Sequence, residues 1–197
     1  MRARLAILQS ALRVELREIL LRDKPDAFLQ TSASGTVAAL RADDRVFDES
    51  LDIMVWALGQ NDPQGLLDLP DAGWGLITEN DGPFKTALDH TKYAVRFPDL
   101  DIEVERGKAA AYLKDLDQRL KGKTALFGDR LTIADYAIAP FVRQFANTDF
   151  DWFERQDWPD LTAWLNRFTQ SDVFAQIMTK YAPWAEGDAP VWFGGER

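Results

Sequence analysis

The spacing of apolar residues changes once along the chain, and this change constrains the fold more than any other feature. Up to residue 60 the spacing predicts short alternating elements: helices over 2–10, 24–29 and 48–58, and strands over 14–20, 36–40 and 45–47. Asp48 is expected to cap the last of these helices. Beyond residue 80 apolar residues recur every three or four positions, as in Leu113, Leu116 and Leu120. The sequence therefore predicts a mixed α/β domain followed by an all-α helical domain.

A turn-rich stretch separates the two patterns. It contains the runs Asn61-Asp62-Pro63-Gln64-Gly65 and Leu69-Pro70-Asp71-Ala72-Gly73. We therefore expect an N-terminal domain over residues 1–60, a linker over 61–78 and a helical domain over 79–197. Within the last of these, residues 182–197 are rich in Pro and Gly and predict an irregular tail that packs through Trp184 and Trp192.

Charge and composition exclude several classes of function. The 197 residues carry 23 Lys and Arg against 32 Asp and Glu, a net charge of -9. This balance disfavours nucleic acids and anionic membrane surfaces as partners. The absence of cysteine excludes disulfides, thiol nucleophiles and Cys-based zinc sites in the chain as written, and His90 is the single imidazole.

Neither a membrane span nor a metal site is expected. No segment is apolar for 18 residues, and the apolar stretch near the start is interrupted by Gln9 and Ser10. These features favour a cytoplasmic protein. The alternating acids between residues 99 and 105 lack the glycine turn of a calcium loop, so we interpret them as a solvated connection.

Several short motifs occur in an informative order. They are Lys24-Pro25, Ser34-Gly35-Thr36-Val37-Ala38-Ala39-Leu40, Asp48-Glu49-Ser50-Leu51-Asp52-Ile53 and Leu131-Thr132-Ile133-Ala134-Asp135. Their order resembles that of the cytosolic glutathione transferase superfamily, and the run from Ala139 to Phe145 resembles a bacterial branch of it. Residues 1–6 resemble the sequence that follows a Cys-bearing turn in related bacterial proteins, which indicates the Cys type. The resemblance implies a thioredoxin-like N-terminal domain, whose first strand is missing here, and an all-α C-terminal domain.

The resemblance also implies glutathione as cosubstrate. Ser50, at a helix N-terminus, would meet the γ-glutamyl carboxylate, which the helix dipole favours. Glu49 would face the ammonium group, and the backbone of Val37 would pair with the extended peptide. Lys24 would meet the glycyl carboxylate, and Ala38 follows Val37 in the binding segment. The alternative is that residues 48–50 are only a helix start and that Lys24 is solvated.

The helical domain supplies the remaining expectations. Tyr93, Phe97 and Tyr112 are candidates for a hydrophobic pocket that takes an unknown electrophile or disulfide. Thr132 and Asp135 form an S/T-x-x-D capping box, which we interpret as structural. A homodimer is possible because members of the superfamily often dimerise.

Two departures from the superfamily pattern leave alternatives open. Ala38 stands where the superfamily has a cis-proline, so the Val37–Ala38 bond is either trans, with a different site, or is held cis by the fold. The strand and turn that carry the catalytic Cys, Ser or Tyr have no counterpart, so no catalytic residue is assigned. We expect Met1 to be an internal methionine; the alternative is a truncated paralogue that binds without catalysing.

Three functions remain open at this point. If an upstream Cys turn exists, we expect glutathione-dependent thiol transfer or conjugation. The first alternative is a catalytically inactive, glutathione-transferase-like binding or protein-interaction module. The second is a helical interaction protein unrelated to glutathione.

Overall fold

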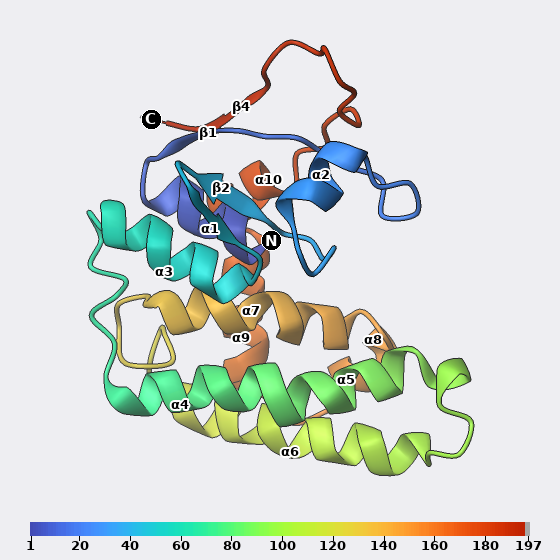
Figure 1. The fold of residues 1–197 in the computed structure, drawn as a ribbon. Helices are drawn as coiled ribbons and strands as arrows, with labels where there is room; N and C mark the ends of the chain where they lie inside the picture. Colours follow the sequence, from blue (N-terminus) through green and yellow to red (C-terminus); the bar gives the residue numbers. More distant parts are fainter. Residues whose placement is uncertain (196–197) are drawn as a thin grey trace. The chain divides into compact units, whose positions relative to one another are not determined.

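The computed structural model describes residues 1–195 (Figure 1). The chain folds into two compact units. Unit 1 combines residues 1–67 with the C-terminal segment that begins at Asp172, and unit 2 spans Asp68–Ser171. The sequence pattern assigned the C-terminal segment to the helical domain, whereas its contacts are with the N-terminal elements. The predicted boundaries after residues 60 and 78 stay a prediction.

Unit 1 contains short strands and helices. In chain order these are α1 (Arg2–Gln9), β1 (Arg13–Glu15), α2 (Asp26–Thr31), β2 (Leu40–Ala42), β3 (Arg45–Phe47), α3 (Ser50–Gln60), α10 (Asp172–Ile177) and β4 (Trp192–Gly194). Helix α1 packs against α3, and Leu5 of α1 and Ile53 of α3 are almost fully buried. Burial of these apolar faces gives unit 1 its core.

The strands of unit 1 form two separate antiparallel pairs. Val46 of β3 lies opposite Arg41 of β2, and Val14 of β1 lies opposite Phe193 of β4. The predicted strand over 45–47 is confirmed, whereas the predicted strand over 14–20 is only three residues long. The prediction of a strand over 36–40 was wrong for all but Leu40, because residues 32–36 form a hydrogen-bonded loop.

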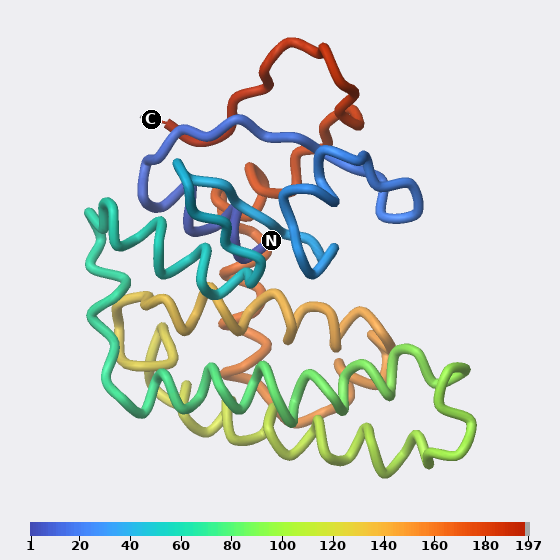
Figure 2. Tube along the Cα trace, in the orientation of Figure 1, coloured from blue at the N-terminus to red at the C-terminus, as the bar shows by residue number. Residues whose placement is uncertain are grey.

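The C-terminal segment is irregular over residues 182–191, as predicted, and it runs along β1, with which its strand β4 pairs. Figure 2 shows its red trace beside the blue segment that follows α1. Beyond the β1–β4 pair, the amide of Leu16 donates to Val191 O at 2.7 Å, and the amide of Trp184 donates to Glu18 O at 2.7 Å. These bonds satisfy backbone groups of a strand that would otherwise present an unpaired edge.

A glycine permits the close approach of β4 to the chain after α1. Gly194 has a φ of +80°, and a Cβ there would lie 2.0 Å from Leu12 O. Arg13 of β1 and Arg17, two residues beyond β1, also cover tryptophans of the C-terminal segment. The Arg13 guanidinium lies 4.6 Å from the centre of the Trp192 ring, and that of Arg17 lies 4.5 Å from the centre of the Trp184 ring. Only glycine fits position 194 without displacing this backbone.

Unit 2 is helical throughout its regular structure. Its elements are α4 (Asp71–Glu79), the π-helical turn η1 (Asn80–Phe84), α5 (Lys85–Lys92), the 3₁₀ turn η2 (Ala94–Arg96), α6 (Ile102–Leu120), α7 (Ile133–Ala146), α8 (Phe150–Glu154) and α9 (Pro159–Thr169). The second half of the segment predicted as a linker thus forms α4, which follows Pro70. Pro83 has no backbone N–H, and the π-helical turn lies at this position.

The core of unit 2 is built around α7. Helix α5 lies beside α6, and α7 contacts α4 and α9 (Figure 1). Leu113 and Leu116 of the predicted apolar stripe on α6 are fully buried, as is Ile138 of α7. None of the helices in the described part of the chain is long and apolar enough to cross a membrane.

Candidate functional site

The start of α3 presents free hydrogen-bonding groups. Glu49 is the N-cap residue and Ser50 is the first residue of the helix. No side chain in the described residues caps this N-terminus, and within them the Ser50 hydroxyl has no hydrogen-bond partner. The first N–H groups of a helix lack intrahelical acceptors, so this helix start can bind an anion.

Asp48 connects this helix start to the loop before β2. Its Oδ2 accepts a hydrogen bond from the Ser34 amide at 3.1 Å and lies 3.5 Å from the Ser32 hydroxyl. Within the loop, the hydroxyls of Ser34 and Thr36 are 2.7 Å apart. The prediction that Asp48 caps α3 was wrong, because its carboxylate binds this loop instead.

The loop leads directly into the predicted peptide-binding segment. The Val37–Ala38 peptide bond is cis. Val37 is 50% exposed and Ala38 is half-buried. The contacts of Asp48 therefore join the segment that contains Val37 to the helix start that contains Ser50.

A hollow of about 480 Å³ lies against β3 and the start of α3. Three acidic residues, Asp48, Glu49 and Asp52, contribute to its wall, and their charge favours a cationic group. The other lining residues are Thr31, Ala33, Val46 and Phe47. Of the five predicted glutathione-binding residues, only Glu49 lines this hollow.

Lys24 lies in the segment between β1 and α2, where it is half-buried. Neither Lys24 nor Ser50, Val37 or Ala38 lines the hollow. The sequence motifs indicated no binding role for Asp48 or Asp52. Their positions, directly before Glu49 and two residues after Ser50, are the signal that could have identified them.

The three aromatic candidates for a substrate pocket lie in different surroundings within unit 2. Tyr112 is 5% exposed, its hydroxyl donates to Leu76 O at 3.3 Å, and burial raises its pKa. This residue belongs to the core rather than to a pocket wall. The cations of Lys92 and Arg96 lie 4.8 Å and 4.6 Å from the centre of the Tyr93 ring. Phe97 packs on His90 with ring centres 4.5 Å apart.

Thr132 and Asp135 form a capping box at the start of α7. Asp135 Oδ2 accepts from the Thr132 amide at 2.9 Å and from its hydroxyl at 3.0 Å. Asp135 Oδ1 accepts from the Leu126 amide and from Trp164 Nε1, both at 2.9 Å. Burial raises the pKa of this carboxyl, while the donated bonds act in the opposite direction.

No metal-ligand cluster is found in residues 1–195: no group of three or more His, Cys, Asp or Glu side chains there could hold a metal ion. The candidate site consists of the uncapped start of α3, the loop held by Asp48 and the acidic hollow.

Comparison with known proteins assigns the chain to a family. One family model, described as the N-terminal domain of glutathione S-transferase, matches residues 1–65, and a second, described as the C-terminal domain of the same enzyme, matches residues 93–167. The chain belongs to the glutathione transferase superfamily. The resemblance seen in the sequence is thus confirmed at the level of the superfamily; the bacterial, Cys-type branch stays a prediction.

Solved glutathione transferases share the fold. Poplar glutathione transferase F1 is 15% identical, with 90% of each chain covered and a TM-score of 0.74. A family member from Pseudomonas fluorescens, solved with two glutathione molecules bound, is 18% identical, with 89% of this chain and 86% of that chain covered and a TM-score of 0.74. A glutathione S-transferase from Rhodospirillum rubrum F11 is 19% identical, with 96% and 90% covered and a TM-score of 0.72.

These matches confirm the predicted glutathione transferase fold, a thioredoxin-like N-terminal domain followed by an all-α one. Among curated protein sequences, none matches this chain.

Proposed function

We propose that this protein is a glutathione-binding member of the superfamily and that the γ-glutamyl end of glutathione binds at the start of α3. The observation that carries the proposal is the uncapped N-terminus of α3, where the Ser50 hydroxyl is free beside an acidic hollow. A γ-glutamyl group carries a carboxylate and an ammonium on one carbon. It therefore needs an anion site and a cation site next to each other.

Ser50 and Glu49 have suitable chemistry for these two groups. The carboxylate accepts hydrogen bonds from the Ser50 hydroxyl and from N–H groups of the first turn, where the helix dipole favours negative charge. The ammonium group lies against Glu49, supported by the charges of Asp48 and Asp52.

The rest of the tripeptide has proposed partners in unit 1. Val37 is 50% exposed, and the backbone at Val37 and Ala38 pairs with the extended cysteinyl part, in the manner of an added strand. Lys24 binds the glycyl carboxylate as a point charge. The last two assignments rest on the superfamily pattern together with the exposure of Val37.

The proposed reaction is glutathione-dependent thiol transfer or conjugation, with an electrophile or a disulfide as second substrate. The chain contains no cysteine, so the thiol available within it is that of bound glutathione. This composition also favours a second candidate, a binding or protein-interaction module without turnover. The proposed setting is the cytoplasm, where glutathione is reduced, and a homodimer is compatible with the proposal.

Titration calorimetry with reduced glutathione tests the binding proposal. We expect Ser50→Ala to weaken binding about tenfold, as for loss of one hydrogen bond to a charged group. Ser50→Thr keeps the hydroxyl and should retain affinity. Asp44→Asn removes an exposed acid outside the hollow and serves as the control. Absence of binding at millimolar glutathione would overturn the proposal. Binding without turnover of a mixed disulfide or an aryl halide would select the second candidate.

A further inference from the structure

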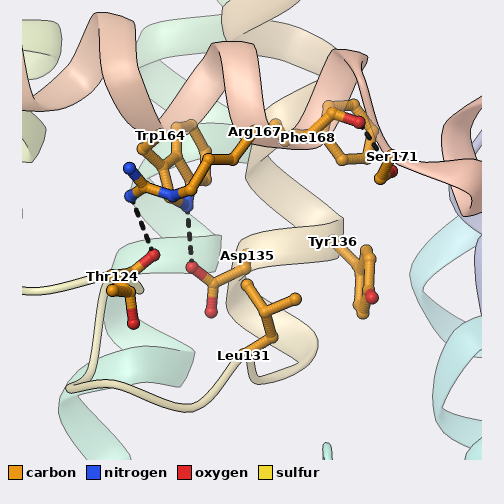
Figure 3. A pocket seen from close by; sticks show the side chains of 9 residues that line it. Thr124, Leu131, Asp135, Tyr136, Trp164, Arg167, Phe168 and Ser171 are labelled. Carbon is orange, nitrogen blue, oxygen red and sulfur yellow. Dashed lines mark hydrogen bonds between the residues drawn. The ribbon is translucent and has the colours of Figure 1, made fainter.

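Unit 2 contains a separate pocket that the proposed function does not use. Its volume is about 230 Å³, and it lies between the start of α7, helix α9 and the segment before α7 (Figure 3). Clefts for drug-sized ligands are roughly 300–1,000 Å³, so this one suits a smaller molecule of one or two fused rings.

The floor of the pocket is rigid. Trp164 is 2% exposed, and its Nε1 donates to Asp135 Oδ1 at 2.9 Å, which fixes the orientation of the indole ring (Figure 3). Each Asp135 oxygen already accepts two hydrogen bonds. A carboxylate offers about four acceptor positions, so Asp135 has none left for a ligand and acts only as part of the floor.

The rim of the pocket combines apolar surface with one cation. Leu131 is 40% exposed there, and the aromatic rings of Tyr136 and Phe168 line the same pocket. Arg167 is exposed and donates from one terminal nitrogen to Thr124 O at 3.0 Å. Within the described residues, its other guanidinium N–H groups have no partner.

We propose that this pocket binds a small planar aromatic carboxylate. The ring system lies among the side chains of Trp164, Leu131 and Phe168, where burial of apolar surface supplies affinity. The carboxylate stays at the rim, where the free N–H groups of Arg167 match its geometry. The remaining polar groups of the floor are satisfied, so Arg167 determines the preference for an anion.

The experiment uses the full chain with 2-naphthoate as the probe and the uncharged 2-naphthamide as its isostere. We expect calorimetry to show naphthoate binding about tenfold tighter than naphthamide, as for one charge-assisted contact. Arg167→Leu should abolish this preference while retaining the weak binding of naphthamide. Arg155→Leu removes the same charge from an exposed position outside the pocket and should behave as the unchanged protein.

The indole N–H resonance of Trp164, assigned with Trp164→Phe, locates the ligand. It should shift when naphthoate binds, with or without saturating glutathione. Equal affinity for the two probes, unchanged naphthoate binding in Arg167→Leu, an unshifted Trp164 resonance, or competition with glutathione would each overturn the proposal. Failure of glutathione itself to bind would contradict only the proposed function.

Discussion

Asp48 Oδ2 accepts a hydrogen bond from the backbone N–H of Ser34 at 3.1 Å. This contact joins two segments that are distant in sequence: the loop that leads into the cis Val37–Ala38 bond and the residues that begin α3. Both segments belong to the proposed glutathione site. The Asp48 carboxylate therefore has two roles: it lines the acidic hollow, and it holds the two segments of the site together.

Removal of the Asp48 carboxylate should weaken glutathione binding even though Ser50 itself is unchanged. In Asp48→Ala we expect the dissociation constant to rise about tenfold, because the loop loses its charged acceptor and must be ordered on binding. Amide hydrogen exchange of residues 32–38 should become faster in the same variant. Asp44→Ala, which removes an exposed acid from the nearby turn, is the matched control. Unchanged exchange in Asp48→Ala would show that the loop is held by other contacts.

The β4 segment should tolerate no side chain at position 194. Gly194→Ala places a Cβ against the backbone oxygen of Leu12, whereas Gly187→Ala meets open space. Both glycines have positive φ, so each substitution costs about 1–2 kcal/mol of backbone strain. Gly194→Ala should cost a further 1–3 kcal/mol or so from overpacking. Urea unfolding measures both variants; equal losses would mean that β4 moves away at no cost.

Hydrogen exchange gives a second readout for this segment. The amide of Leu16 donates to Val191 O, so its protection reports whether the C-terminal segment remains on β1. We expect the protection to fall in Gly194→Ala and to remain in Gly187→Ala.

Glu105 should make unit 2 sensitive to acid. The hydrogen bond from Lys108, followed by that with His90 at 2.8 Å, lowers the pKa of this carboxyl below its usual value of 4.5. The unfolded state then binds the proton more readily than the folded state. The ionised Glu105 carboxylate therefore stabilises the folded state fully above about pH 4.5, and this contribution to the free energy of unfolding is lost as the pH falls through the folded-state pKa.

Glu105→Gln tests this dependence. In the variant, the free energy of unfolding should fall less steeply between about pH 4.5 and pH 3 than in the unchanged protein. Glu154→Gln, at an exposed position, should keep the original slope. Identical slopes in all three proteins would show that Glu105 has the same pKa in the folded and unfolded states.

Sequence patterns predicted the structural features in which the interacting residues are close together along the chain. The apolar stripe Leu113, Leu116 and Leu120 lies on one buried face of α6. Thr132 and Asp135 form a capping box in the structure. In both cases the interacting groups are three or four residues apart, so the local spacing contains the information.

Strand pairing and the contacts of the site needed the tertiary structure. Nothing near Val14 in the sequence indicates that its strand partner is Phe193, and a Pro- and Gly-rich tail does not predict a strand. Likewise, Asp48 has the local pattern of a helix cap, yet its carboxylate binds Ser34 across the loop. A sequence determines by itself which side chains are near along the chain. Contacts between distant segments depend on the packing of the whole unit, because their loop-closure entropy is offset only when many such contacts form together.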